Sequence, residues 1–278
     1  MKLRSKMGGS KIYVHIALLL FSISFIFPFV WMFLTSFKSA TEAITVPPRW
    51  FPETFLFQNY PELFDLYPFG AFFINSMLTA FFRVVCALAF SSIAGYAFAR
   101  IKFPGRNVLF GILIIQFMVP YQIFILPQYK MVLKMGQLNT VFALVFPGLV
   151  SIFGTFLMVQ AFKSMPKELS EAATIDGANQ WTIFSRIYLP LAKSHMVALG
   201  ILTVLGSWKD LMWPLIVNTD IEKMTLTSGI LFLSSAKEYV QSYPLLMVGA
   251  TIASIPLVII YFIFQRFIIE GVASTGIK

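Results

Sequence analysis

The residues best suited to chemistry between proteins lie in the most polar internal segment, residues 163–194. Glu168 and Glu171 could pair with basic side chains across a protein interface. Ala172 and Ala173 lack bulk, so another backbone could approach them closely. These residue types predict that a small acidic surface docks into a partner, and they do not suggest catalysis.

A short helix would carry this acidic surface. Pro166 suits the start of a helix, residues 167–175 can form two helical turns, and Gly177 suits a left-handed stop. Asp176 stands directly before that stop. An ordinary amphipathic loop helix would show a similar pattern, so the residues alone leave both interpretations open.

Side chains that could build a catalytic or metal centre do not cluster in the sequence. His15 and His195 have no Asp or Glu nearby, and the single cysteine, Cys86, cannot form an internal disulfide. The sequence also lacks the Gly-x-x-x-x-Gly-Lys-Ser/Thr phosphate loop. We therefore expect no enzyme activity, metal or cofactor in this chain, and any ATP and Mg would be bound by another polypeptide.

The composition indicates a membrane protein. Of the 278 residues, 58% are apolar and 12% are charged, and the mean hydropathy is +0.80. A soluble domain carries about 25% charged residues, so this chain needs a bilayer around its outer surface. The net charge of +9 would suggest nucleic acid binding in a soluble protein, but cytoplasmic loops of membrane proteins are enriched in Lys and Arg. We expect a lipid membrane and no nucleic acid as a partner.

Apolar stretches of about 20 residues are long enough to cross a bilayer as helices. We expect an all-α integral membrane protein with about six transmembrane helices, forming a single domain over residues 1–278. The first stretch is longer than the apolar core of a signal peptide, about 7–15 residues, so we interpret it as a retained anchor. The expected spans cover residues 12–37, 69–99, 107–128, 140–162, 195–217 and 244–267.

The distribution of basic residues sets the expected orientation. With the N-terminus inside, 13 of the 21 Lys and Arg residues lie on the cytoplasmic side and 7 on the outer side, while Arg83 lies within the second span. The positive-inside rule then places both termini and residues 163–194 in the cytoplasm. Residues 38–69 would form an external loop with a short helix.

Polar side chains inside the spans are costly in lipid and usually face the protein interior or a water-filled path. Trp208, Asp210 and Trp213 gather at one end of the fifth span, where aromatic faces and hydrogen-bonding groups could hold a sugar. Trp also marks the membrane interface, and Lys209 and Asp210 could lie in water, so both interpretations stay open. The candidates for a translocation path are Asn75, Gln116, Gln122, Ser151, Trp208, Asp210 and Trp213.

Prolines inside the expected spans predict a packed bundle. A proline in a transmembrane helix is tolerated where neighbouring helices satisfy the carbonyl groups that it frees. The prolines in question are Pro28, Pro120, Pro127, Pro147, Pro214 and Pro256.

The polar segment resembles the EAA loop of ATP-binding-cassette (ABC) importer permeases. It carries Glu171-Ala172-Ala173, a Gly at position 177, and Ile187-x-Leu189-Pro190. The Asp-Gly-Ala form at 176–178 resembles the carbohydrate-uptake branch of the family, and the chain is similar to maltose-permease G-type subunits. Further along, Trp208-Lys209-Asp210 and Trp213-Pro214-Leu215 resemble a Trp-Asn-Glu…Trp-Pro-Leu stretch, with Lys209 replacing the usual Asn. The tail at 270–278 resembles one that reaches into the ATPase dimer, although the closing Gly of the family is absent.

The resemblance implies a fold, a function and partners. The fold would be a type I ABC importer permease bundle with a cytoplasmic coupling helix. The chain would move a sugar or oligosaccharide into the cytoplasm of a bacterium or archaeon, as a multi-pass protein of the cell (inner) membrane. Its partners would be a second, F-type permease that is a different chain, two ATP-binding-cassette ATPase subunits, and an extracytoplasmic sugar-binding protein. The residues implied in coupling are Glu168, Glu171, Ala172, Ala173, Asp176, Gly177 and Pro190.

An ion-coupled secondary transporter of a small polar solute is the alternative function. Such transporters usually place Asp or Glu near the bilayer midplane. The acidic residues of this chain lie in loops or at span ends, which argues against that alternative.

Overall fold

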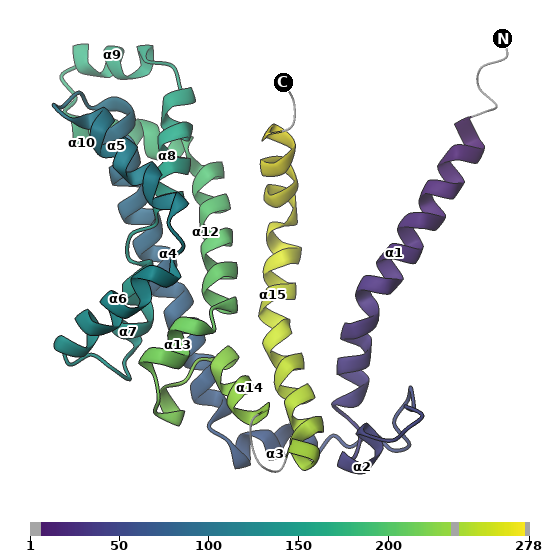
Figure 1. Ribbon diagram of the computed structural model, residues 1–278. Helices are drawn as coiled ribbons and strands as arrows, with labels where there is room; N and C mark the ends of the chain where they lie inside the picture. Colours follow the sequence, from purple (N-terminus) through teal and green to yellow (C-terminus); the bar gives the residue numbers. More distant parts are fainter. Residues whose placement is uncertain (1–6, 235–238, 276–278) are drawn as a thin grey trace, which may run out of the picture. The chain divides into compact units, whose positions relative to one another are not determined.

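The computed structural model in Figure 1 describes residues 7–234 and 239–275, with side chains described over 12–234 and 243–265. Over these ranges every regular element is a helix. Three helices are long and apolar enough to cross a membrane unaided, and their spanning parts are Ile12–Thr35 of α1 (Met7–Thr35), all of α4 (Phe69–Arg100), and Tyr243–Gln265 of α15 (Tyr239–Thr275). The all-α expectation is confirmed for the described part of the chain.

Three further pairs of helices pass the same test of length and hydropathy together although each pair is bent, which brings the total among the described residues to six if each pair counts as one span. Arg106–Met118 and Gln122–Lys134 meet at 106°, Val141–Gly148 and Ile152–Ser164 at 46°, and Gln180–Leu191 and Lys193–Lys209 at 74°. The helices are α5 (Arg106–Ile115), a 3-10 turn at Gln116–Met118, α6 (Gln122–Lys134), α7 (Val141–Val145), a 3-10 turn at Phe146–Gly148, α8 (Ile152–Ser164), α10 (Gln180–Ile183), α11 (Leu189–Leu191) and α12 (Lys193–Lys209).

The expected third span, residues 107–128, is not one continuous helix. Its helix stops at Val119, which is extended at φ −89° and ψ 121°. Proline disfavours helical geometry in the residue before it and lacks an N–H group, so Pro120 accounts for the break. Hydropathy alone does not reveal such a bend.

The expected fifth span, residues 195–217, also differs from the structure. Its helix, α12, begins earlier and ends at Lys209, and a separate helix, α13 (Met212–Val217), follows after the extended residue Asp210. A proline clashes with the carbonyl group four residues before it, so Pro214 prevents α12 from continuing through Asp210. The chain then adds a 3-10 turn at Ile221–Lys223 and α14 (Leu226–Ser234).

The described chain divides into two compact units, where the sequence led us to expect one domain. The first is Met1–Phe69 with Ile230–Ile255, and the second is Gly70–Gly229 with Pro256–Lys278. In the first unit, an 18-residue window of α1 has no buried residue.

A polar anchor orders the loop of the first unit, which contains α2 (Ala40–Ala43) and α3 (Asn59–Leu66) where one short helix was expected. The Asn59 side chain donates hydrogen bonds of 2.9 Å to the carbonyl groups of both Ser36 and Lys38. Lys38 is only 1% exposed, and its ammonium donates to the Arg49 carbonyl at 2.6 Å and lies 4.3 Å from the Trp31 ring centroid. Burial lowers the pKa of Lys38, and the nearby Glu42 carboxylate offsets part of that effect.

In the second unit, α4 packs against α8 and α12 (Figure 1). A Cβ atom at Gly95 would lie 2.6 Å from the Cβ of Met158, and one at Gly154 would lie 2.4 Å from the Ser91 hydroxyl. The two glycines therefore allow the helices to approach closely, as small residues do in membrane bundles. The buried cluster beside them comprises Tyr96, Met158, Phe162, Ile183, Phe184, Tyr188, Ala192 and Leu199.

We predict that Asn59→Ala opens the loop between α1 and α3. The substitution leaves two carbonyl groups without their donor, which costs about 1–3 kcal/mol. Trypsin should then cleave faster after Arg49 and should begin to cleave after Lys38. The exposed neighbour Gln58, whose side chain caps nothing, provides the control variant Gln58→Ala. Equal cleavage rates in the two variants would contradict the anchor.

Candidate functional site

The acidic segment folds into α9 (Glu168–Ile175), with Glu168 and Glu171 in its first turn. Negative charge there is favoured by the helix dipole. No residue of α9 is buried by the chain. The sequence-based prediction of a short acidic helix is confirmed.

Gly177 ends α9 in the expected left-handed conformation, at φ +79°. The N–H of Ala178 donates to the Ala173 carbonyl at 2.9 Å, and the N–H of Gly177 donates to the Thr174 carbonyl at 3.0 Å. This pair of bonds is a Schellman motif, which satisfies carbonyl groups at the helix end. Asp176 is exposed immediately before the turn. The motif fixes the direction in which the chain leaves α9.

The two alanines of α9 lie in different surroundings. Ala172 is exposed, whereas Ala173 is half-buried and packs against the cluster around Tyr96. The sequence did not single out Ile175, which is 86% exposed and extends the outer face of α9 with an apolar side chain. An exposed Ile on an otherwise acidic helix is the signal that could have identified it.

Aromatic and basic residues hold the segments on either side of α9. Tyr188 donates from its hydroxyl to the Pro166 carbonyl at 3.3 Å, and Tyr96 donates to the Gln180 side-chain oxygen at 2.9 Å. Arg100 donates to the carbonyl groups of Phe162 and Met165 and lies 4.6 Å from the centroid of the Tyr188 ring. The end of α4 is thereby joined to both ends of the loop.

The chain after α9 passes through a π-helical segment, Phe184–Tyr188, and then α11. Pro190 lies in α11, directly before the 74° bend that leads into α12. A cavity of about 390 Å³ lies between α9 and the end of α4, and Arg100, Ser170 and Glu171 are among its lining residues. The loop therefore connects the exposed helix α9 to α8 on one side and to α12 on the other.

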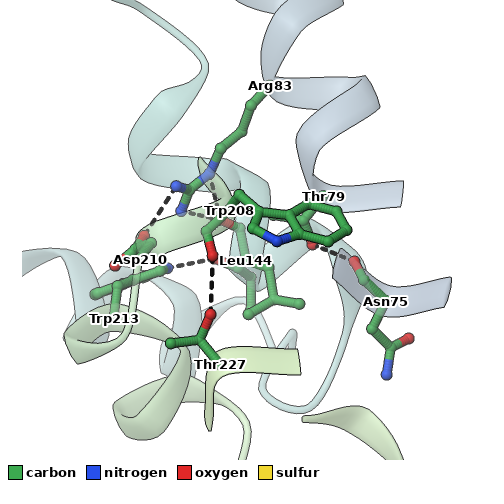
Figure 2. Close-up of polar contacts among 9 residues, drawn as sticks. Asn75, Thr79, Arg83, Leu144, Trp208, Asp210, Trp213 and Thr227 are labelled. Atoms are coloured by element: carbon green, nitrogen blue, oxygen red, sulfur yellow. Dashed lines mark hydrogen bonds and ion pairs between the residues drawn. The ribbon is translucent and has the colours of Figure 1, made fainter. Parts of the chain in front are cut away.

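A second polar site lies around Arg83, in the middle part of α4 (Figure 2). Arg83 is 8% exposed, and its Nη1 donates to the Asp210 carboxylate at 2.8 Å. Its Nε and Nη2 donate to the Leu144 carbonyl at 3.0 and 2.5 Å. An arginine in a span needs such partners because an isolated charge is costly in lipid.

The Trp213 indole has a similar structural role. Its Nε1 donates to the Ala143 carbonyl at 2.7 Å. In a regular helix that carbonyl would accept from residue 147, but Pro147 has no N–H to donate. Trp213 therefore supplies the donor that the proline removes, as the prolines in the sequence led us to expect.

The remaining candidates for the translocation path differ in the hydrogen bonds that they make. Asn75 donates to the carbonyl groups of Glu222 and Met224 at 2.9 and 3.0 Å. Ser151 caps α8 by accepting from the Gly154 N–H at 2.9 Å, and Trp208, 6% exposed, accepts from Thr227 through its carbonyl at 2.8 Å.

Gln116 and Gln122 are exposed on either side of the Pro120 break, and neither side chain makes a hydrogen bond within the described part of the chain. Lys209 is exposed, as one sequence interpretation held, whereas the Asp210 side chain is 19% exposed and bonded to Arg83. Among the described residues no group of three His, Cys, Asp or Glu side chains could hold a metal ion. The side chains of the tail at 270–278 lie outside those described.

The sequence did not lead us to predict that Arg83 pairs with Asp210. The available signal was a lone arginine deep in an apolar span, which requires an acidic partner such as Asp210. The carbonyl groups of Ala143 and Leu144 give no signal of their own, except that Pro147 follows four residues after Ala143.

The chain matches known proteins along most of its length. Residues 87–274 match the family described as binding-protein-dependent transport system inner membrane component. The chain is 34% identical over 256 residues to the arabinooligosaccharides transport system permease protein AraQ of Halalkalibacterium halodurans, covering 91% of each chain. It is 28% identical over 273 residues to the sn-glycerol-3-phosphate transport system permease protein UgpE of Yersinia enterocolitica, covering 96% of this chain and 97% of the relative.

A solved structure has the same fold. It is the crystal structure of a bacterial ABC transporter involved in the import of the acidic polysaccharide alginate. One of its chains superimposes with a TM-score of 0.79 at 22% identity, covering 96% of this chain and 98% of that one. Because the family match covers well over half of the sequence, the chain belongs to the inner-membrane permease components of binding-protein-dependent ABC transport systems.

Proposed function

We propose that this permease is one half of the transmembrane pathway of an importer that brings a sugar or oligosaccharide into the cytoplasm. The observation that carries the proposal is the exposed acidic helix α9 with its left-handed Gly177 stop, in a chain of this family. A sugar is the favoured substrate because the relative AraQ serves arabinooligosaccharide transport. The family membership leaves the ion-coupled alternative without support.

In this proposal α9 docks on a separate ATPase subunit. Glu168, Glu171, Ala172 and Ile175 present an acidic surface with an apolar end, which suits a groove lined by basic and apolar side chains. Asp176 and Gly177 fix the end of the helix, while Ala173 seats it on the bundle. Closure of the ATPase would push α9 and its bonded neighbours as one piece.

The displacement would reach the spans at two points. One is the junction of α8 with Pro166, which Arg100 and Tyr188 hold. The other is the bend after Pro190, where α12 begins. Because α8 and α12 pack against α4, a shift of the loop would change the packing around the path.

The proposed assembly contains a second, F-type permease, two ATPase subunits that bind ATP and Mg, and an extracytoplasmic sugar-binding protein. Its location would be the cell membrane of a bacterium or archaeon, with both termini of this chain in the cytoplasm. Ser151 borders a cavity, Asn75 and Trp213 donate to backbone carbonyl groups, and Asp210 accepts from the Arg83 guanidinium.

The proposed orientation predicts which positions can be labelled from outside the cell. A membrane-impermeant thiol reagent should modify Thr54→Cys in sealed cells and should leave Thr174→Cys unmodified until the membrane is opened. Both positions are exposed on the chain, so the two variants are matched in accessibility. Modification of Thr174→Cys in sealed cells would reverse the assigned topology.

The energy source gives a second prediction. The purified chain should neither bind nor hydrolyse ATP, because it carries no phosphate loop. Equilibrium dialysis with labelled ATP and a phosphate-release assay test this directly, with the complete importer as the positive control. Stoichiometric ATP binding by the isolated chain would contradict the proposal that ATP is bound only by a separate subunit.

The third prediction concerns coupling. Glu171→Lys should abolish co-purification of the ATPase, because a like-charge contact across an interface costs several kcal/mol. Gly177→Val should retain the charge but distort the helix end, at a cost of about 1–3 kcal/mol for a strained backbone. Sugar uptake should fall about fivefold or more in both variants, since 1.4 kcal/mol corresponds to a tenfold change.

Matched controls are available in other loops. Glu62→Lys places the same charge change in the first turn of α3, and Gly136→Val places the same residue at another left-handed position, φ +65°. Both controls should retain ATPase binding and uptake. The coupling role is refuted if Glu171→Lys and Gly177→Val transport normally at wild-type membrane abundance.

A further inference from the structure

An apolar groove of about 570 Å³ lies between α4, the start of α12 and α15, within the second compact unit. Its α12 wall runs along one face of the helix from Lys193 through Gly200 to Val204, and Val84 of α4 and Ile260 of α15 lie on the other walls. Gly200 keeps the groove open, because the nearest atom to a Cβ there, outside its own helix, would be the Cγ1 of Val84 at 3.9 Å. Apart from Lys193, the lining residues have apolar side chains or, at Gly200, none.

The groove has the length of one leaflet of a bilayer. Val204 comes eleven residues after Lys193, and an α-helix rises 1.5 Å per residue, so the α12 wall is about 16 Å long. The hydrocarbon core of a bilayer is about 30 Å thick, so each leaflet contributes about 15 Å. An acyl chain lying along α12 would therefore reach from the charged end of the groove to its apolar end.

The charged end of the groove favours an anion. Lys193 is exposed, and its ammonium makes no ion pair or hydrogen bond within the described part of the chain. No side chain caps the start of α12, so the positive end of the helix dipole adds to the charge of Lys193. The described residues that line the groove include no Asp or Glu that could neutralise this charge.

The two ends of the groove have different roles in selecting a lipid. Lipid tails are as apolar as Leu side chains, so the apolar walls accept an acyl chain without preferring one lipid over another. The preference must come from the headgroup. A phospholipid with a net negative charge gains from Lys193, whereas the choline of a zwitterionic lipid brings a positive charge close to it.

We propose that this groove binds an anionic phospholipid, with one acyl chain between α4, α12 and α15 and the phosphate on Lys193. The proposal goes beyond the import function, and only its assignment to the cytoplasmic leaflet uses the proposed orientation. Pro190 also lines the groove, directly before the bend into α12. The lipid would thus contact the chain at the point where the α9 loop joins the bundle.

The test uses the purified complex of both permeases and the ATPase subunits, in proteoliposomes of equal parts phosphatidylglycerol and phosphatidylcholine with the same acyl chains. In two parallel samples, one lipid or the other carries a photoreactive diazirine at the end of a chain. After illumination and digestion, mass spectrometry measures the lipid adducts on the lining residues of α12 and α15. One basic residue at the membrane surface contributes about 1 kcal/mol, so phosphatidylglycerol adducts in the groove should exceed phosphatidylcholine adducts about fivefold.

Two variants assign the effect to the groove. Lys193→Glu should remove the preference for phosphatidylglycerol, and Gly200→Phe should lower the adducts of both lipids by filling the groove. The control for charge is Lys102→Glu, because Lys102 is exposed on the side that we assign to the cytoplasm but lies outside the groove lining. The control for volume is Gly111→Phe in α5, where a Cβ atom would meet open space. Both controls should behave as the wild type.

Equal yields of the two lipids in the wild type, or the same ratio in Lys193→Glu and Lys102→Glu, would overturn the proposal. A groove without lipid adducts, in a complex where a photoreactive amino acid at Val204 captures the partner permease, would also overturn it and assign the groove to a protein contact. If Gly200→Phe fails to assemble, Lys193→Glu decides the question. The adduct ratio is measured without transport, so its failure leaves the import function standing, and absence of sugar uptake would overturn the import function without changing the ratio.

Discussion

Every backbone polar group inside the bilayer must find a partner within the protein, and this constraint governs the second unit of the chain. Pro147 removes the donor for the Ala143 carbonyl, and Trp213 replaces it at 2.7 Å. Arg83 then binds the adjacent Leu144 carbonyl and the Asp210 carboxylate at the end of α12. One group of contacts therefore joins α4, α7 and the break between α12 and α13.

The loop around α9 is held by local hydrogen bonds at both ends, and the outer surface of the helix is free. The Schellman motif at Gly177 satisfies the end of the helix, and Tyr96, Arg100 and Tyr188 bond the flanking segments. What remains exposed is a surface made of Glu168, Glu171, Ala172 and Ile175. A rigid piece with an uncovered face is the form that a coupling element requires in order to transmit force.

Local features were predictable from the sequence because a few adjacent residues determine them. The acidic helix and its stop depend on residues 166–178, and they were identified with their correct geometry. Apolar length indicated which helices are long enough to span a membrane, but it carries no information on direction, so the bend at Pro120 and the break before Pro214 were missed. The Arg83–Asp210 pair joins residues 127 positions apart, and only the folded chain brings them together. Likewise, the sequence pattern treated Ala172 and Ala173 alike, although one faces outward and the other packs inward.

In the proposed mechanism, α9 seats in an ATPase subunit and moves with it. A photo-crosslinking amino acid placed at Ala172, which is exposed, tests the contact in intact cells. The same probe at Thr54, which is exposed in the loop between α2 and α3, serves as the control. Illumination should join the Ala172 probe to the ATPase subunit, with a yield that changes when ATP is depleted, and the Thr54 probe should give no such adduct. An Ala172 probe that never captures the ATPase, in cells where the importer is assembled and active, would contradict this mechanism.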